Sequence, residues 1–144
     1  MIYAIGVLAL LAVVLVGLYN RLAKQKIVVE EASADIETFL KQRYDMIPNL
    51  VEIVKGYAKH EQETFKQITE MRAKAMSASS LSEKMELEDQ LSKAVSKIIA
   101  VAENYPELKA NTNFLDLQSS LKDLEDNIQK SRRFYNGAAR DFNT

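Results

Sequence analysis

The first residues of the chain form an uninterrupted apolar run that restricts its fold more than any other feature. Ile2 to Leu18 are seventeen residues without a charge, rich in Val, Leu, Ala and Ile. At 1.5 Å per residue, a helix of this length measures about 26 Å and nearly spans a hydrocarbon core of ~30 Å. Tyr3 and Tyr19 stand at its two ends, where aromatic rings favour the membrane interface. The run therefore predicts a transmembrane anchor, which we place at residues 1–19.

The charges that flank the run predict that it is retained and predict its orientation. A cleaved signal peptide has Lys or Arg before its apolar segment, whereas only the amino terminus precedes Ile2. The nearest basic residues, Arg21, Lys24 and Lys26, follow the run. Because basic residues stay on the cytoplasmic side, we expect the N-terminus outside the cell membrane and residues 20–144 in the cytoplasm.

Beyond Asn20 the apolar residues recur every three or four positions, which is typical of helices with one buried face. We expect four helices and a reversal of the chain at Arg43–Asn49, since Pro48 disfavours helix before it. The predicted seams are Leu22, Val29, Ala32, Ile36, Phe39 and Leu40; Leu50, Val51, Val54, Tyr57, Ala58, Phe65, Ile68 and Ala75; Leu87, Leu91, Ala94, Ile98, Val101 and Tyr105; and Phe114, Leu117, Leu121, Leu124, Ile128, Ser131 and Tyr135.

These helices predict an all-α fold, an antiparallel up-down-up-down four-helix bundle that follows the anchor. Ser80 and Glu83 match a capping box, so the third helix should begin near Leu81. The strict three-and-four spacing of the fourth seam is that of a coiled coil or bundle. Because no proline precedes Ile47, we expect the first helix to be continuous with the anchor.

Composition excludes most catalytic and cofactor chemistry. The chain has no Cys and a single His60, so it lacks thiolate ligands and cannot build a multi-histidine metal centre. No glycine-rich phosphate loop occurs, and the 19 basic and 20 acidic residues nearly cancel. We therefore expect no enzyme activity, no cofactor or metal, no small-molecule substrate and no nucleic-acid partner.

Four separated motifs carry a resemblance to a known family. They are residues 43–51 (RYDMIPNLV), 55–61 (KGYAKHE), 102–110 (AENYPELKA) and 132–136 (RRFYN). In this order after a single N-terminal span, they closely resemble the LemA family of bacterial membrane proteins. The resemblance implies an antiparallel helical bundle on a short anchor with its N-terminus outside, in a family whose biochemical activity is poorly defined. Members usually continue past the segment matching residues 141–144, and a chain truncated at that point would have an incomplete membrane-proximal surface.

The predicted connectivity places two turns, Arg43–Asn49 and Asn104–Asn113, together at a distal tip. Both are richer in large side chains than a turn requires, which favours a surface for a protein partner. The alternative is that these side chains close the end of the core and that the asparagines cap helices. The candidate partner-binding residues are Arg43, Tyr44, Asp45, Met46, Asn49, Asn104, Tyr105 and Leu108.

The opposite end of the predicted bundle carries basic residues that anionic lipid would attract. The alternative is that these residues only complement helix dipoles. The candidate lipid-proximal residues are Arg21, Lys24, Lys26, Lys130, Arg132 and Arg133.

Two functions fit a chain without catalytic groups. The first is a membrane-anchored scaffold or adaptor that presents its helical bundle to an unidentified protein partner in the cytoplasm. The second is a subunit of a self-assembling, membrane-shaping homo-oligomer, although Gly6 and Gly17 make no GxxxG pair in the anchor. In both cases the anchor contacts membrane lipid.

Overall fold

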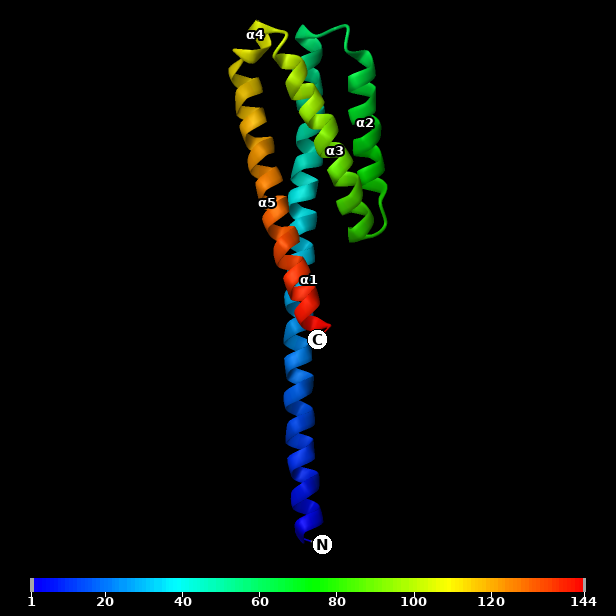
Figure 1. The fold of residues 1–144 in the computed structure, drawn as a ribbon, viewed down its shortest axis with the longest axis vertical. Helices are drawn as coiled ribbons and strands as arrows, with labels where there is room; N and C mark the ends of the chain where they lie inside the picture. Colours follow the sequence, from blue (N-terminus) through cyan, green and yellow to red (C-terminus); the bar gives the residue numbers. More distant parts are fainter. Residues whose placement is uncertain (1, 144) are drawn as a thin grey trace. The chain divides into compact units, whose positions relative to one another are not determined.

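The computed structural model describes residues 2–143, and the chain is helical over nearly all of this range (Figure 1). Five helices follow one another: α1 (Ile2–Tyr57), α2 (Gln62–Ser77), α3 (Leu81–Ala102), α4 (Pro106–Lys109) and α5 (Thr112–Phe142). No strand occurs between residues 2 and 143. The prediction of an all-α chain with a long apolar N-terminal helix is confirmed.

α1 begins in the apolar run and continues for 56 residues. The predicted continuity of the anchor with the first helix is therefore confirmed. The predicted reversal at Arg43–Asn49 is wrong, because α1 passes through this segment and ends only at Tyr57. What we expected to be one helix from Leu50 to Ala75 is consequently the end of α1 followed by α2.

The surroundings of Pro48 explain why α1 continues. Proline has no N–H, so the carbonyl oxygen of Tyr44, four residues earlier, loses its helical donor. Arg72 on α2 replaces that donor, because its Nε atom donates a hydrogen bond to the Tyr44 oxygen at 2.6 Å. Ile47 and Leu50, close to the proline on either side, are fully buried. Packing and a hydrogen bond from another helix thus offset the cost of a proline inside α1.

The chain divides into two compact units, which we describe separately. Among the described residues, unit 1 consists of 2–35 and 130–143, and unit 2 consists of Ile36–Gln129. In unit 1 the carboxyl end of α5 contacts α1, since Gln25 Nε2 donates a hydrogen bond to the backbone oxygen of Asp141 at 3.0 Å.

The apolar core of unit 2 receives side chains from every helix that enters it. In Figure 1, α2 and α3 lie side by side, joined by a short connection. The α5 seam is confirmed at Phe114, Leu121, Leu124 and Ile128, whereas Leu117 of the same seam is only half-buried. The core residues include Ile36, Leu40, Ile47, Leu50 and Val54 of α1, Phe65, Ile68 and Ala75 of α2, Leu91, Val95, Ile98 and Ala102 of α3, Leu108 of α4, and Phe114, Leu121, Leu124 and Ile128 of α5.

The buried face of α3 differs from the predicted seam by a rotation of one residue at three positions. Leu91 and Ile98 are buried as expected. Val95 and Ala102 are buried in place of Ala94 and Val101, and Glu88 is buried in place of Leu87. The buried residues of α3 are Glu88, Leu91, Val95, Ile98 and Ala102. The spacing of this set is again three and four, so the periodicity was present in the sequence with a carboxylate at one of its positions.

Local hydrogen bonds define the connections of unit 2. Glu83 N donates to Ser80 Oγ at 3.2 Å, as predicted for the start of α3, while the Glu83 carboxylate accepts from Ser79 N at 3.1 Å. Asn111 caps α5 by accepting from Phe114 N at 3.0 Å. α4 was not predicted; it is a single turn with Pro106 at its start.

α1 is the one helix, among the residues the structure describes, that is long and apolar enough to cross a membrane. Its apolar side chains are exposed in the predicted anchor: Ile5, Val13 and Leu15 expose 65%, 70% and 65% of their surface. Because unit 1 does not bury this surface in a protein core, the segment has the character expected of a lipid-facing helix.

Candidate functional site

Unit 2 contains a group of charged side chains inside its core. Arg43 on α1 and Glu88 on α3 expose only 3% and 2% of their side chains, and Arg43 Nη1 lies 2.5 Å from Glu88 Oε1. The same nitrogen also pairs with Oε2 of Glu125 on α5. The pairing connects three helices. We call the group of Arg43, Glu88, Glu125, Tyr44 and Ser92 the buried charge cluster.

The two carboxyl groups of the buried charge cluster, those of Glu88 and Glu125, differ in the hydrogen bonds that they accept. Ser92 Oγ donates a hydrogen bond to Glu125 Oε2 at 2.8 Å. Within the described part of the chain, no well-aligned hydrogen bond reaches either Glu88 oxygen, the Tyr44 hydroxyl or Arg43 Nε, although the Tyr44 hydroxyl lies near enough to Glu88 to act to lower its pKa. Arg43 and Glu88 therefore form a close ion pair without an aligned hydrogen bond, and the Glu88 carboxyl group remains under-satisfied.

This environment moves the pKa values of the two carboxyl groups in opposite directions. Burial raises the pKa of Glu88 to about 7, against the lowering effect of Arg43 and with a raising effect of Glu125. Burial also acts to raise the pKa of Glu125, but Arg43 and hydrogen bonds from neighbouring side chains outweigh it and the value falls below its ordinary range. At neutral pH the cluster therefore holds one cation, one anion and one carboxyl group near the midpoint of its titration.

A pocket of about 360 Å³ lies beside the buried charge cluster, between α3 and α5. Of the side chains of Arg43, Glu88 and Glu125, only that of Glu125 reaches the surface appreciably, with 32% of it exposed. Ser92 and Glu125 resemble a hydroxyl with a base, but a lowered pKa makes Glu125 a weak base. The arrangement is suited to holding helices in register more than to chemistry. The residues that line the pocket are Arg43, Ser92, Val95, Ser96, Ile99, Gln118, Leu121, Lys122 and Glu125.

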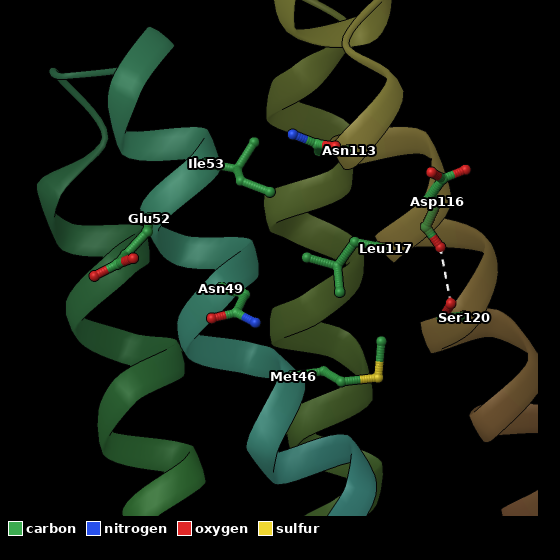
Figure 2. Close-up of a pocket in the computed structure, with 8 residues that line it drawn as sticks. All are labelled: Met46, Asn49, Glu52, Ile53, Asn113, Asp116, Leu117 and Ser120. Atoms are coloured by element: carbon green, nitrogen blue, oxygen red, sulfur yellow. Dashed lines mark hydrogen bonds between the residues drawn. The ribbon is translucent and has the colours of Figure 1, made fainter.

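A second hollow, of about 450 Å³, runs between α1 and α5 on the surface of unit 2. Figure 2 shows Leu117 extending from α5 toward α1, at a level between Ile53 and Met46. Amide and carboxylate groups border these apolar side chains. We call it the α1–α5 groove; its residues are Met46, Asn49, Glu52, Ile53, Asn113, Asp116, Leu117 and Ser120.

The structure separates the residues that we predicted to form one distal tip. Arg43 and Tyr44 are buried in the middle of α1, so neither is part of a turn. Asp45 is exposed, and Met46 and Asn49 line the α1–α5 groove. The error follows from the continuation of α1 through Pro48.

The other half of the predicted tip lies beside the end of α1. Asn104 and Tyr105 line a hollow together with Gly56 and Tyr57, and Asn111 Nδ2 donates to the Tyr57 hydroxyl at 3.1 Å. Leu108 is fully buried, as the alternative of core closure anticipated. The Asn104–Asn113 connection therefore meets the end of α1 near Tyr57, and only Asn113, at its last position, lines the α1–α5 groove with Met46 and Asn49.

The six candidate lipid-proximal residues all lie in unit 1. Arg21, Lys24 and Lys26 are exposed on α1 directly after the apolar run, and Lys26 pairs with Glu30 at 3.5 Å. On α5, Lys130 and Arg133 are exposed and Arg132 is half-buried. Among residues 2–143 no group of three His, Cys, Asp or Glu side chains could hold a metal ion, and His60 is exposed.

Comparison with known proteins agrees with the motifs. Residues 32–144 match the sequence model of the LemA family. The chain belongs to the LemA family. It is also similar to Protein LemA of Metamycoplasma hominis, with 29% identity over 132 residues, which cover 91% of this chain. The chain spans 60% of the length of that relative.

Both features of unit 2 lie in the region that matches the LemA family, yet sequence reasoning missed several of their residues. Glu88, Ser92 and Glu125 were not among the candidate site residues. The signal available for Glu88 was its place three residues before Leu91 on a seam, where a carboxylate needs a buried cation. No local pattern marks Arg72, whose partner is a carbonyl oxygen 28 residues away.

Proposed function

We propose that this LemA-family chain is a single-pass membrane protein whose unit 2 acts as a scaffold or adaptor for a protein partner. The observation that carries the proposal is the continuity of α1, which exposes apolar side chains over its first part and supplies Ile36, Leu40 and Ile47 to the core of unit 2. A folded unit is thereby joined to a segment suited to lipid without an intervening linker. The proposal assigns the chain no catalytic step.

The proposed location is a bacterial cell membrane, with the N-terminus outside and unit 2 in the cytoplasm. Three basic residues, Arg21, Lys24 and Lys26, directly follow the apolar run. Their position supports the orientation through the preference of Lys and Arg for the cytoplasmic side.

We also propose that the helices of unit 2 form an antiparallel four-helix bundle. Contacts between helices support this arrangement: Glu37 on α1 pairs with Lys84 on α3 at 2.9 Å, and Arg43 pairs with side chains of α3 and α5. Arg72 adds a link from α2 to α1. Buried apolar residues on each of the longer helices provide the common core.

The α1–α5 groove is the proposed partner site, and an amphipathic helix with basic flanks is its proposed occupant. Met46, Ile53 and Leu117 lie along the α1–α5 groove, which therefore suits the apolar face of a third helix. Glu52 and Asp116 border it, and Ile36–Gln129 carries 12 basic against 16 acidic residues, a net side-chain charge of −4. Positive residues on the partner would complement this charge.

Site-specific photocrosslinking in bacterial membranes tests the proposal. A photoreactive amino acid at Ser120, on the edge of the α1–α5 groove, should give an adduct with a different protein, whereas the same probe at exposed Glu70 on α2 should not. Asp116→Lys should weaken the Ser120 adduct because it repels a basic helix. Asp126→Lys makes the same charge change on α5 outside the groove and should leave the adduct intact.

The outcomes separate the scaffold from its alternatives. A Ser120 adduct of twice the chain's mass would favour the self-assembling oligomer and contradict the scaffold. Equal adducts from Ser120 and Glu70, or none from either, would contradict a partner site in the α1–α5 groove.

A further inference from the structure

We propose that the junction between α1 and the last turn of α5 in unit 1 forms a surface that binds an anionic lipid bilayer. The junction consists of Arg21, Lys24 and Lys26 on α1 with Arg140 and Phe142 on α5, and we call it the juxtamembrane surface. The inference rests on the proposed membrane anchor and adds a second, electrostatic contact between the protein and lipid.

One hydrogen bond sets the height of this surface above the apolar run. Gln25 Nε2 donates to the Asp141 oxygen at 3.0 Å, so the last turn of α5 lies beside the second turn of α1 after Leu18. Gln25 follows Leu18 by seven residues, which is about 10 Å along a helix. The polar headgroup layer extends roughly 5–8 Å beyond each side of the hydrocarbon core. The end of α5 therefore lies just outside the headgroups when α1 crosses the bilayer.

The side chains at this height are suited to an anionic interface. Arg21 lies four residues before Gln25, so it shares the helix face that meets α5 and is one turn nearer the lipid. Lys24 is exposed beside it, and Phe142 keeps 36% of its surface exposed at the carboxyl end of α5. Basic groups that flank an aromatic ring are the usual composition of a surface at the headgroup level.

The charge of unit 1 also favours anionic lipid. Its segments contain seven basic and four acidic residues, a net side-chain charge of +3, whereas unit 2 has a net charge of −4. The basic residues are also next to the lipid-facing part of α1 in sequence. Unit 1 is therefore attracted by an anionic membrane surface that would repel unit 2.

The same geometry removes three of the predicted lipid-proximal residues from the surface. Lys130 and Arg133 precede Asp141 by eleven and eight residues, which places them about 16 and 12 Å farther from the lipid along α5. Arg132 lies between them. This separation exceeds the Debye length of about 8 Å at physiological salt, so these charges should contribute little to lipid binding. They supply a matched control for Arg21 and Lys24.

The absence of tryptophan from the chain permits a direct test. Full-length Phe142→Trp protein is reconstituted into vesicles of phosphatidylcholine alone or with phosphatidylglycerol, each containing a headgroup-labelled quenching lipid. Phosphatidylglycerol should increase quenching of the tryptophan, and high salt should abolish the increase. A Phe134→Trp probe, which lies eight residues farther from the lipid, should not respond.

Paired charge removals decide whether the named residues cause the response. Arg21→Gln with Lys24→Gln should weaken the contact with phosphatidylglycerol by roughly fivefold for each residue, whereas Lys130→Gln with Arg133→Gln should leave it unchanged. The proposal would be overturned if the two pairs of substitutions weakened the contact with phosphatidylglycerol equally. It would also be overturned if quenching of the tryptophan did not depend on phosphatidylglycerol. Flotation with phosphatidylcholine vesicles separates the two proposals: protein that does not float refutes the anchor and this inference together, while protein that floats without a response to phosphatidylglycerol refutes this inference alone.

Discussion

Arg43 and Glu88 form an ion pair at 2.5 Å in the core of unit 2, with almost no exposed surface on either side chain. One comes from the middle of α1 and the other from α3, so the pair connects segments that are 45 residues apart in the sequence. A cation and a carboxylate that are both withdrawn from water stabilise a fold only while each keeps its partner. The stability of unit 2 should therefore depend on the integrity of the buried charge cluster.

Arg43→Met should reduce the free energy of unfolding by roughly 3–5 kcal/mol, because it leaves Glu88 buried without its cation. Adding Glu88→Leu should recover most of this loss, since the remaining Glu125 is partly exposed and accepts a hydrogen bond from Ser92. Urea unfolding of the full-length protein in detergent, followed by circular dichroism, measures both effects. Lys41→Met changes an exposed residue of α1 and should alter stability by less than about 0.5 kcal/mol. An equal effect of Arg43→Met and Lys41→Met would contradict a stabilising cluster.

Stability should decrease as the pH rises from about 5 to about 7.5. Burial raises the pKa of Glu88 from its ordinary 4.5 to about 7, so the folded protein binds this proton more tightly than the unfolded chain does. The contribution of Glu88 is fully present below pH 4.5 and is lost as the pH passes about 7, with a total change on the order of 3 kcal/mol. The lowered pKa of Glu125 acts with the opposite sign and below this window.

Glu88→Gln tests this assignment because it imitates the protonated carboxyl group. Thermal unfolding between pH 5 and 7.5 should then lose most of the pH dependence that the unmodified chain shows. Glu86→Gln, on an exposed position of the same helix, should preserve that dependence. The assignment is wrong if Glu88→Gln and Glu86→Gln give the same slope against pH.

Pro48, Tyr44 and Arg72 should be energetically coupled. Arg72→Met should cost roughly 1–2 kcal/mol, because it removes the donor that serves the Tyr44 carbonyl oxygen. In a Pro48→Ala background the alanine N–H can serve that oxygen, so the same substitution should cost much less. A double-mutant cycle in urea measures the coupling, which we expect to exceed about 0.5 kcal/mol.

Lys74→Met is the matched control for this cycle, since Lys74 is an exposed residue of α2 two positions away. It should show no coupling to Pro48→Ala. Additive effects of Arg72→Met and Pro48→Ala would mean that the hydrogen bond does not compensate for the proline.

The proposed orientation predicts the reactivity of single cysteines, which is convenient because the native chain has none. Ser79→Cys and Lys97→Cys, both at exposed positions of unit 2, should resist a membrane-impermeant thiol reagent in intact cells. Tyr3→Cys should react, and permeabilised cells should label the other two. Labelling of Ser79→Cys and Lys97→Cys in intact cells would reverse the topology.

Features that depend on neighbours in the sequence were predictable. The apolar run, the helical periodicity, the continuity of α1 with the anchor and the Ser80 cap all arise from interactions within a few residues. The seam of α5 was predictable for the same reason, since an apolar face repeated at three and four must be buried somewhere. The motifs of the LemA family were equally visible and are confirmed by the match over residues 32–144.

The candidate site was less predictable, because it depends on where other helices pack. The predicted tip combined Arg43–Asn49 with Asn104–Asn113, and the position of Pro48 alone could not reveal that α1 continues to Tyr57. Once α1 continues, Met46 and Asn49 belong to the α1–α5 groove, and the Asn104–Asn113 connection meets Tyr57 instead.

The sequence by itself therefore determined the helical class, the membrane-suited segment and most of the apolar positions, because periodicity and local capping act over a few residues. Only the tertiary structure decided that a proline remains in a helix and that a glutamate enters a core. Arg72 supplies the Tyr44 oxygen with a donor from α2, and Arg43 supplies Glu88 with a cation from α1. In both cases the side chain that offsets an unfavourable residue, a proline in a helix or a glutamate in a core, comes from a segment distant in the sequence. No local sequence pattern predicts that contact.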